Sequence, residues 1–545
     1  MSRADERLPE VTDALLPAEE ARGKLVRSAS VITLLTLASR LTGYARDKTI
    51  AAFFGASAAS DVFYTAFRIP NLLRQLVAEG ALPGVFIPSY AERRKNGSVE
   101  DARVFAARIL SALTLIVSAI TVSGILFAPA IVRLLAKGFA STPGKIPLTV
   151  YLTRLMFPYL CFISVAALLQ AVLNAHGRFA ISAMSPILLN LAIIFGAVVL
   201  APRFREPTVA LAVGVLIGGI LQMAVQIPSA RSLSAIGKWN VRFSDPAVRA
   251  VFFLLVPRLF GFGIYAITIA LSTRFASVFG DGAVSYLTFG NRVIELVRGG
   301  FVISVSTAIL PLLAQQALEE DRGPFKDTLR FGLRLVAFVT IPWAVGLAVL
   351  RETVIAALFQ GGRFGATATA ATAQALSFYA IGLFFISSSS LLVFAHYARK
   401  DTRTPVLCAA ADLAVFVSVS IALRPWGVAS VAFATSCGAI ANFVLLLAFL
   451  RRREGQLGLK ELAATLTRVL AASAAMALIA GRGAAWVLTA YAPRTAGERL
   501  LFLAVATIVG MIVYLGVAML LRSTEPREFV RLLRMRAPRR PGASP

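Results

Sequence analysis

Residues 38–92 read ASRLTGYARDKTIAAFFGASAASDVFYTAFRIPNLLRQLVAEGALPGVFIPSYAE. The pattern predicts two apolar helices joined by a turn of small residues at Gly55–Ser60, with ionised side chains set within both helices. These are Arg40, Arg46, Asp47, Arg68, Arg74 and Glu79. A charge at membrane depth costs roughly 2.5–3.5 kcal/mol, so a hairpin with several charges is expected to line a wet cavity. Because the excess is cationic, the pattern indicates an anionic ligand.

The composition indicates a polytopic membrane protein built of helices. The chain has 545 residues, of which 57% are hydrophobic, and its mean hydropathy is +0.76. Its apolar runs reach about 20 residues without the alternation of a membrane barrel. The fourteen predicted helices span 28–53, 60–90, 104–136, 147–173, 179–201, 207–229, 247–279, 283–317, 329–350, 368–397, 404–423, 426–450, 460–481 and 498–521. A hydropathy scale alone scores the charged helix pairs within 28–90 and 247–317 poorly as membrane spans.

The distribution of positive charge predicts the orientation in the membrane. The net charge is +27, and the connections after even-numbered helices hold roughly twice as many basic residues as those after odd-numbered helices. Both termini are therefore expected in the cytoplasm. This distribution also argues against nucleic-acid binding, because much of the charge lies in loops between apolar runs.

An internal repeat organises the predicted helices. Arg40-Leu41-x-Gly43 corresponds to Arg258-Leu259-x-Gly261, and two further motifs recur at a similar offset of about 220 residues. Six helices followed by six in the same orientation are typical of transporters, whose substrate sites lie at the interface of the halves. The expected parts are a cytoplasmic N-terminal tail at 1–27, an N-lobe at 28–230, a linker at 231–246, a C-lobe at 247–452, two additional helices within 453–521 and a basic cytoplasmic tail at 522–545.

Arginines dominate the charged positions of both halves. Arg68, Asn71 and Arg74 share a helical face through their spacing of three residues. The matching region of the second half carries Asn291, Arg292, Glu295 and Arg298, with Arg258 and Arg274 on the preceding helix. The planar guanidinium fork suits phosphate oxygens better than a lysine does. Ion pairs inside the helix bundle, such as Arg292 with Glu295, are the competing explanation, but the arginines outnumber the acids.

Asp412 is the only acid in its predicted helix. Such a buried acid either carries a coupling cation or proton, or serves as partner to a nearby arginine.

The segment GFASTPGK at Gly138–Lys145 lacks the spacing of a phosphate-binding loop and is interpreted as an external loop. Metal-binding and hydrolase motifs are missing from the sequence, so an enzyme or an ATP-driven pump is not expected. An ion gradient (Na+ or H+) or the membrane potential is the expected driving force, without a cofactor.

The same residues resemble a known family. The motifs S-R-x-x-G-x-x-R-D, P-N-L-L-R and A-E-G-A within 38–92 are similar to the opening of the MurJ/MviN proteins, the lipid II flippases of the multidrug/oligosaccharidyl-lipid/polysaccharide exporter superfamily. The likeness continues through Asn291-Arg292-x-x-Glu295, Ile309-Leu310-Pro311 and Asp401-x-x-Thr404-Pro405, and covers roughly 28–521.

The resemblance implies fourteen helices, two lobes around a V-shaped cavity, alternating access, and a groove for the undecaprenyl tail at the last two helices. It implies that lipid II, the lipid-linked disaccharide-pentapeptide, is moved to the outer leaflet of the bacterial cytoplasmic membrane, with membrane lipids and the cell-wall synthesis machinery as partners. The family's cavity residues map onto Arg40, Arg46, Arg74, Asp47, Asp61, Glu79, Arg292 and Glu295. The chain departs from the family pattern at Gln75, Asn291 and Ala266.

Three other functions predict different features. An exporter of another polyprenyl-diphosphate glycan would keep the arginines but need not have the last two helices. A membrane enzyme acting on polyprenyl phosphates should show metal-binding acids or a histidine at the membrane surface. A cation-drug antiporter predicts an acid-dominated cavity, which is the reverse of the observed charge.

Overall fold

The structure is a computed structural model that describes residues 18–75, 82–233, 237–299, 303–491, 495–523 and 525–526. Within these ranges the regular structure is helical, apart from one isolated bridge between Gly361 and Phe364. The all-helical fold class is therefore confirmed.

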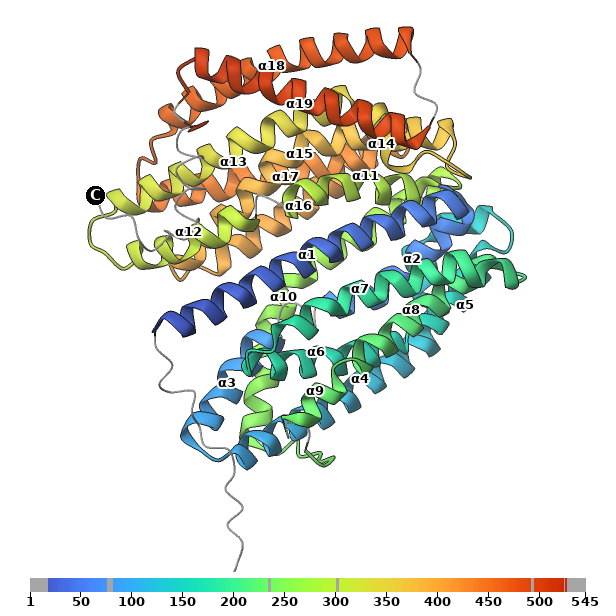
Figure 1. Ribbon diagram of the computed structural model, residues 1–545, viewed down its shortest axis with the longest axis vertical. Helices are drawn as coiled ribbons and strands as arrows, with labels where there is room; N and C mark the ends of the chain where they lie inside the picture. Colours follow the sequence, from blue (N-terminus) through green and yellow to red (C-terminus); the bar gives the residue numbers. More distant parts are fainter. Residues whose placement is uncertain are drawn as a thin grey trace, which may run out of the picture. The chain divides into compact units, whose positions relative to one another are not determined.

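The helices follow the chain in this order (Figure 1). The first half contains α1 (Ala18–Phe54), α2 (Ala58–Arg74), α3 (Leu82–Asn96), α4 (Val99–Leu135), α5 (Lys145–Met156), α6 (Tyr159–Ala175), α7 (Phe179–Phe195), α8 (Pro207–Ala224) and α9 (Ile227–Ser232). The second half contains α10 (Pro246–Ala276), α11 (Ala283–Val297), α12 (Ile303–Gln316), α13 (Gly323–Val349), α14 (Arg351–Phe359), α15 (Ala366–Ala398), α16 (Arg403–Ala422), α17 (Ala429–Glu454), α18 (Leu459–Ala490) and α19 (Ala496–Leu520).

Each predicted helix overlaps one helix or two consecutive helices of the structure. Ten spans among the described residues are long and apolar enough to cross a membrane. The four predicted ranges missing from that set are 28–53, 60–90, 247–279 and 283–317, where the sequence places the arginines. The prediction missed α14, because a helix of nine residues is too short to be found as a membrane span.

The chain forms two compact units. Unit 1 contains the residues up to Thr49, Ile69–Phe127 and Leu152–Leu259, and unit 2 contains Ile50–Arg68, Ala128–Tyr151 and the residues from Phe260 onward. In unit 1, α8 packs against α6 and α7. Gly214 and Gly218 allow the close approach to α7, because a Cβ at Gly214 would lie 2.7 Å from the carbonyl oxygen of Ala192. Small residues four apart are a common device for packing membrane helices.

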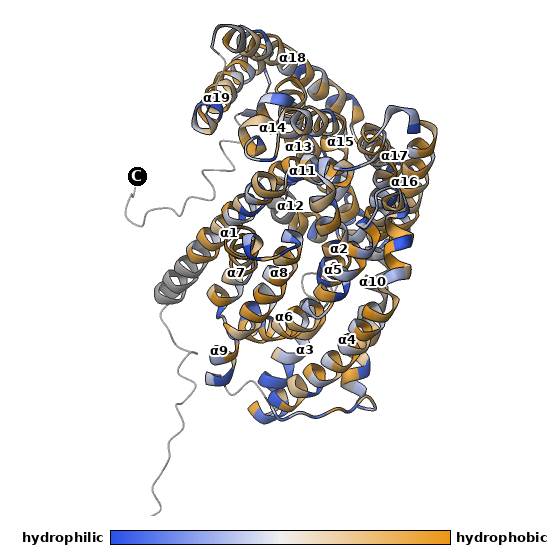
Figure 2. Cartoon of the chain, turned by 90° about the vertical axis from the view of Figure 1, so that its right-hand side faces the viewer, coloured by the Kyte–Doolittle hydropathy of each residue, from blue (hydrophilic) through white to orange (hydrophobic). Residues whose placement is uncertain are grey.

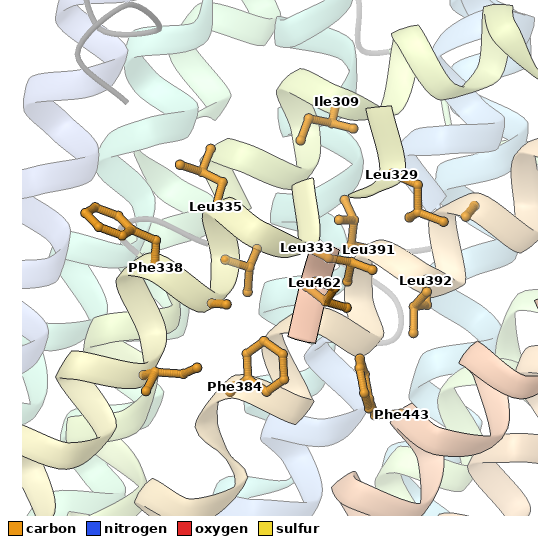
Figure 3. Close-up of a cluster of buried hydrophobic side chains, with 14 of the residues drawn as sticks. Ile309, Leu329, Leu333, Leu335, Phe338, Phe384, Leu391, Leu392, Phe443 and Leu462 are labelled. Carbon is orange, nitrogen blue, oxygen red and sulfur yellow. The ribbon is translucent and has the colours of Figure 1, made fainter. Parts of the chain in front are cut away.

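The core of unit 2 is formed where α13, α15 and α17 meet (Figure 3). Leu333, Leu391 and Phe443 come from these three helices and are buried together.

The turn after α1 also belongs to this unit. Gly55 has a φ of +66° and closes α1, and its Cβ position lies only 2.6 Å from the carbonyl oxygen of Arg363. The predicted small-residue turn is thus confirmed, and glycine is required there by both conformation and space.

The last two helices pack on α13 and α14 within unit 2 (Figure 1). Glu525, just beyond α19, is fully buried and accepts hydrogen bonds from Arg334 of α13 at 2.6 and 2.9 Å. Thr465 of α18 donates to the same carboxylate at 2.9 Å, and Ser523 donates at 2.6 Å. Burial alone would raise the pKa of Glu525, but these hydrogen bonds outweigh burial and lower the pKa to about 2. The carboxylate therefore joins α13, α18 and the end of α19.

Replacing Glu525 with alanine should destabilise the protein at pH 7 by about 3 kcal/mol, because the substitution leaves a partly buried guanidinium without its partner. The folded pKa of about 2 lies below the ordinary value of 4.5, so this contribution is complete above pH 4.5 and is lost as the pH falls toward 2. Thermal unfolding of the detergent-solubilised protein between pH 7 and pH 3 measures both effects. The exposed Glu352 provides the matched control, since Glu352→Ala should change the melting temperature little. Equal melting of Glu525→Ala and the parent at pH 7 would refute the role.

Candidate functional site

Arg46 of α1 is fixed by two partners in unit 1. Its Nε and one terminal nitrogen donate to Oδ1 of Asp47 at 2.9 and 2.7 Å, and its other terminal nitrogen donates to Oδ1 of Asn190 on α7 at 3.0 Å. The Asn190 amide nitrogen donates to the Ser39 carbonyl and the Thr42 hydroxyl, both at 3.3 Å. The amide oxygen is therefore directed toward the guanidinium. Asn190 was not predicted, although a single asparagine in the apolar run of α7 was a usable signal.

Two further predicted arginines lie in unit 1. Arg40 lies on α1, six residues before Arg46, and is partly buried. Arg74 of α2 donates through Nε to Oδ1 of Asn71 at 3.0 Å, which confirms that the two side chains share a helical face. Glu79, the predicted partner of this region, lies outside the described residues.

Arg68 belongs to unit 2, although it is only six residues before Arg74 in α2. One terminal nitrogen donates to the hydroxyl of Thr273 and to the Ile269 carbonyl on α10, the latter at 3.4 Å. The other terminal nitrogen donates to the hydroxyl of Thr288 on α11 at 3.3 Å. These three acceptors are uncharged, so the contacts orient the guanidinium without neutralising it.

The predicted cluster on α11 is present in unit 2. Arg292 donates to Oε2 of Glu295 at 2.8 Å, and the Asn291 amide donates to Oε1 of the same carboxylate at 3.0 Å. The ion pair is well exposed, with 39% of the Arg292 side chain and 40% of the Glu295 side chain accessible. The ion-pair explanation for these two residues is thus confirmed in geometry, and the exposure leaves the pair open to exchange of partners.

Arg298 and two tyrosines extend this cluster. The Nε of Arg298 is buried and has no hydrogen-bond partner in the described part of the chain. Its charge interacts electrostatically with Tyr265 of α10 and with Glu295. Tyr265 and Tyr379 of α15 also interact electrostatically with Arg68. Neither tyrosine was predicted, because nothing in the sequence shows that α10 and α15 bring them to the same arginine.

Asp61 occupies a different environment, at the start of α2. It is fully buried and pairs with Nζ of Lys145 at 2.9 Å. Its carboxylate also accepts from the backbone nitrogens of Gly282 and Ser285 at 2.8 and 2.9 Å, and from the Ser285 hydroxyl at 2.7 Å. Lys145 is 4% exposed and also pairs with Asp281 at 2.7 Å. The external loop predicted at 138–145 therefore ends in a buried lysine, which the sequence analysis missed.

The remaining predicted residues have fewer described contacts. Asp412 of α16 faces α17 at Gly438, where a Cβ would lie 2.1 Å from its Oδ1, and it makes no hydrogen bond or ion pair with a described residue. Arg258 lies on α10, and its side chain is outside the described residues. Among the residues that the structure covers, no group of histidine, cysteine and acidic side chains could hold a metal ion.

The predicted arginines are divided between the two units. Unit 1 contains the first arginine group, defined as Arg40, Arg46, Arg74 and Arg258, and unit 2 contains the second, defined as Arg68, Arg292 and Arg298. A guanidinium is a permanent donor that does not release its proton at physiological pH, so the groups are suited to binding an anion and not to acid–base catalysis.

Sequence comparison extends the likeness to most of the chain. Residues 50–502 match the sequence model of the family described as "Lipid II flippase MurJ". The "Lipid II flippase MurJ" of Burkholderia cenocepacia is 35% identical over 434 residues, which are 79% of this chain and 84% of that protein. The "Probable lipid II flippase MurJ" of Vibrio cholerae is 33% identical over 432 residues, which are 78% of this chain and 82% of that protein.

Solved structures agree with the sequence relatives. "Lipid II flippase MurJ, inward closed conformation" superposes with a TM-score of 0.75 at 25% identity, and the match covers 92% of this chain and 99% of that structure. An inward-facing multidrug resistance MATE family transporter of the MOP superfamily has a TM-score of 0.65 at 13% identity over 79% of this chain and 98% of its own, which shows a shared transporter fold. The chain is a multi-pass membrane protein that belongs to the lipid II flippase MurJ family.

Proposed function

We propose that this protein moves lipid II from the inner to the outer leaflet of the bacterial cytoplasmic membrane, with both of its termini in the cytoplasm. The observation that carries the proposal is the set of arginines oriented by hydrogen bonds in the charged helices of a lipid II flippase family member. The relatives matched by sequence carry the name lipid II flippase, which favours lipid II over another polyprenyl-diphosphate glycan.

The arginines bind the diphosphate of the substrate through charge-assisted hydrogen bonds. Diphosphate oxygens match the guanidinium fork, and such bonds are roughly twice as strong as neutral ones. Arg68 requires no rearrangement of a charged partner, because its acceptors among the described residues are two hydroxyls and a carbonyl. Arg292 must exchange Glu295 for the ligand, and an exposed pair of this kind contributes only about 0–1 kcal/mol. Both residues can therefore bind an anion at low cost.

The polyprenyl tail requires an apolar surface that remains in contact with lipid. The last two helices provide such surface, with Leu478 and Trp486 of α18 and Ile512 and Leu520 of α19 all more than half exposed. They pack on α13 and α14 of unit 2. The hydropathy colouring of Figure 2 shows that their turns are mainly apolar. We assign them to binding the tail, because a long hydrocarbon chain loses favourable contacts whenever it is exposed to water.

An ion gradient or the membrane potential drives the cycle, by way of Asp412. A carboxylate in an apolar helix without a described hydrogen-bond partner is stabilised by a bound cation or by protonation. Conformational change follows only if the ion binds one state more tightly than the other. Alternating access then couples the ion to the lipid substrate through their shared conformational states.

The first test is complementation with arginine variants. Depletion of the resident lipid II flippase in a dependent host should be rescued by this chain and not by Arg292→Ala, because the variant loses a charge-assisted contact worth about 1.5–3 kcal/mol, or roughly tenfold to a hundredfold in affinity. Outer-leaflet lipid II is measured directly by its accessibility to an external probe. Arg351→Ala, at an exposed arginine of α14, is the control and should rescue fully. Full transport by a well-expressed Arg292→Ala variant would contradict the role of Arg292, and failure of the native chain would contradict lipid II as the substrate.

The second test concerns the coupling residue. Asp412→Asn keeps the size of the side chain but removes its negative charge, so transport by the variant should no longer respond to an imposed Na+ or H+ gradient. Reconstituted vesicles with defined gradients measure this response. Glu352→Gln, at an exposed acid, should retain the response of the parent. A gradient response unchanged in Asp412→Asn would exclude Asp412 as the coupling group.

A further inference from the structure

The segment Gly237–Asp245 connects α9 to α10 and has an unusual alternation of residue types. Its sequence is GKWNVRFSD, in which apolar Trp239, Val241 and Phe243 alternate with other residues and Lys238 and Arg242 supply positive charge. The segment contains no helix. We call it the interfacial segment.

Three contacts within unit 1 fix the interfacial segment along the beginning of α4. The backbone nitrogen of Asn240 donates to the Ser111 hydroxyl at 3.0 Å, and Asp245 forms an ion pair with Arg108. Gly237 approaches α4 so closely that a Cβ would lie 2.7 Å from the Cβ of Ala107. The segment therefore has a defined position on α4, and its one acid is paired with an arginine.

The side chains left over by these contacts are both apolar and cationic. Trp239 is 63% exposed, Val241 36% and Phe243 44%, and Lys238 and Arg242 are exposed as well. Arg249, one turn into α10, is also exposed. In Figure 2, hydrophilic turns gather where α3 ends and α4 begins, the same region of unit 1. Exposed aromatic side chains next to uncompensated positive charge need a partner that is apolar on one side and anionic on the other.

The position along α4 places this surface at the level of lipid headgroups. Apart from Val99 at its first residue, the exposed large apolar side chains of α4 lie from Leu115 to Leu134, a rise of about 29 Å at 1.5 Å per residue. That length matches the hydrocarbon core of a bilayer, about 30 Å. Ser111 lies four residues before Leu115 and therefore about 6 Å outside the apolar band. Tryptophan is enriched at this level, where its ring contacts both apolar and polar surroundings.

We propose that the interfacial segment binds anionic lipid headgroups. Lys238 and Arg242 contact the headgroup phosphates, and Trp239 and Phe243 insert beside them at the boundary of the acyl chains. The site attaches the connection between the two sequence repeats to the membrane surface. The proposal goes beyond lipid II transport and takes from the proposed function only the orientation that puts this loop on the cytoplasmic leaflet.

The test uses tryptophan fluorescence of the full-length protein in vesicles. Trp343, Trp426 and Trp486 are replaced by phenylalanine so that Trp239 is the only reporter, and the vesicles contain phosphatidylcholine with phosphatidylglycerol, one of the two brominated near the headgroup. Quenching of Trp239 by brominated phosphatidylglycerol should exceed quenching by brominated phosphatidylcholine at the same mole fraction. Lys238→Gln with Arg242→Gln should weaken this preference by up to roughly fivefold per residue, the contribution of one basic side chain near an anionic surface.

A second reporter separates lipid selectivity from simple contact with the bilayer. The variant that retains only Trp486, a 71% exposed residue of α18, should be quenched equally by the two brominated lipids. Both reporter proteins must melt at the temperature of the parent. Three results overturn the proposal: Trp239 not quenched by either lipid, equal quenching by both, or a preference that survives Lys238→Gln with Arg242→Gln. Protection of Trp239 by an added acidic peptide and not by lipid would instead identify a soluble protein as the partner. Because none of these measurements involves transport, failure here leaves the lipid II assay unaffected.

Discussion

The cost of an ionised group in an apolar helix governs the rest of this structure. Each such charge costs roughly 2.5–3.5 kcal/mol at membrane depth, so a chain with several must satisfy each of them by contacts or by water. The structure uses three kinds of contact. Asp61 is paired with a lysine, Arg46 is shared between a carboxylate and the amide of Asn190, and Arg68 is surrounded by hydroxyls and a carbonyl. The first two kinds neutralise the charge by an ion pair, since Arg46 pairs with Asp47 at 2.7 Å. The third kind orients the cationic Arg68 by uncharged acceptors, which suits the binding of an anion.

Burial separates the charges that stabilise the fold from those that are available to a ligand. The Lys145 and Asp61 side chains are 2% and 0% exposed, and removing one partner of such a pair costs about 3–5 kcal/mol. Arg292 and Glu295 are 39% and 40% exposed, and an exposed pair contributes about 0–1 kcal/mol. The Arg292–Glu295 pair therefore costs little to break, whereas the Asp61–Lys145 pair costs several kcal/mol to break. The type of basic residue follows the type of partner. Lys145 is a compact point charge between the two carboxylates of Asp61 and Asp281. Arginine, whose planar guanidinium can form two parallel hydrogen bonds, occupies the positions proposed to bind an anion.

Apolar run length predicted the ten spans that are apolar enough to cross a membrane, because a membrane span needs about 20 apolar residues whatever its partners are. Arginine content predicted which four helices would be too polar for hydropathy criteria. Spacing within one helix predicted the pairs Asn71–Arg74 and Arg292–Glu295. The contacts that the sequence did not reveal join distant segments: Lys145 to Asp61, Asn190 to Arg46, and Thr273 to Arg68. Asn190 stands out as the one asparagine of an apolar run, but nothing local shows which residue each of the three contacts, so only the tertiary arrangement could identify the pairs.

Asn291 shows how one neutral residue adjusts the charge of the second arginine group. The resemblance to the family leads one to expect an aspartate there, which would add a second carboxylate beside Arg292. The amide instead donates to Oε1 of Glu295, beside Arg292 on Oε2, and supplies no negative charge of its own. Three arginines then face a single described carboxylate within the cluster, leaving a local excess of positive charge. A diphosphate carries two to three negative charges. The asparagine thus leaves the cluster with one negative charge fewer than an aspartate would give it.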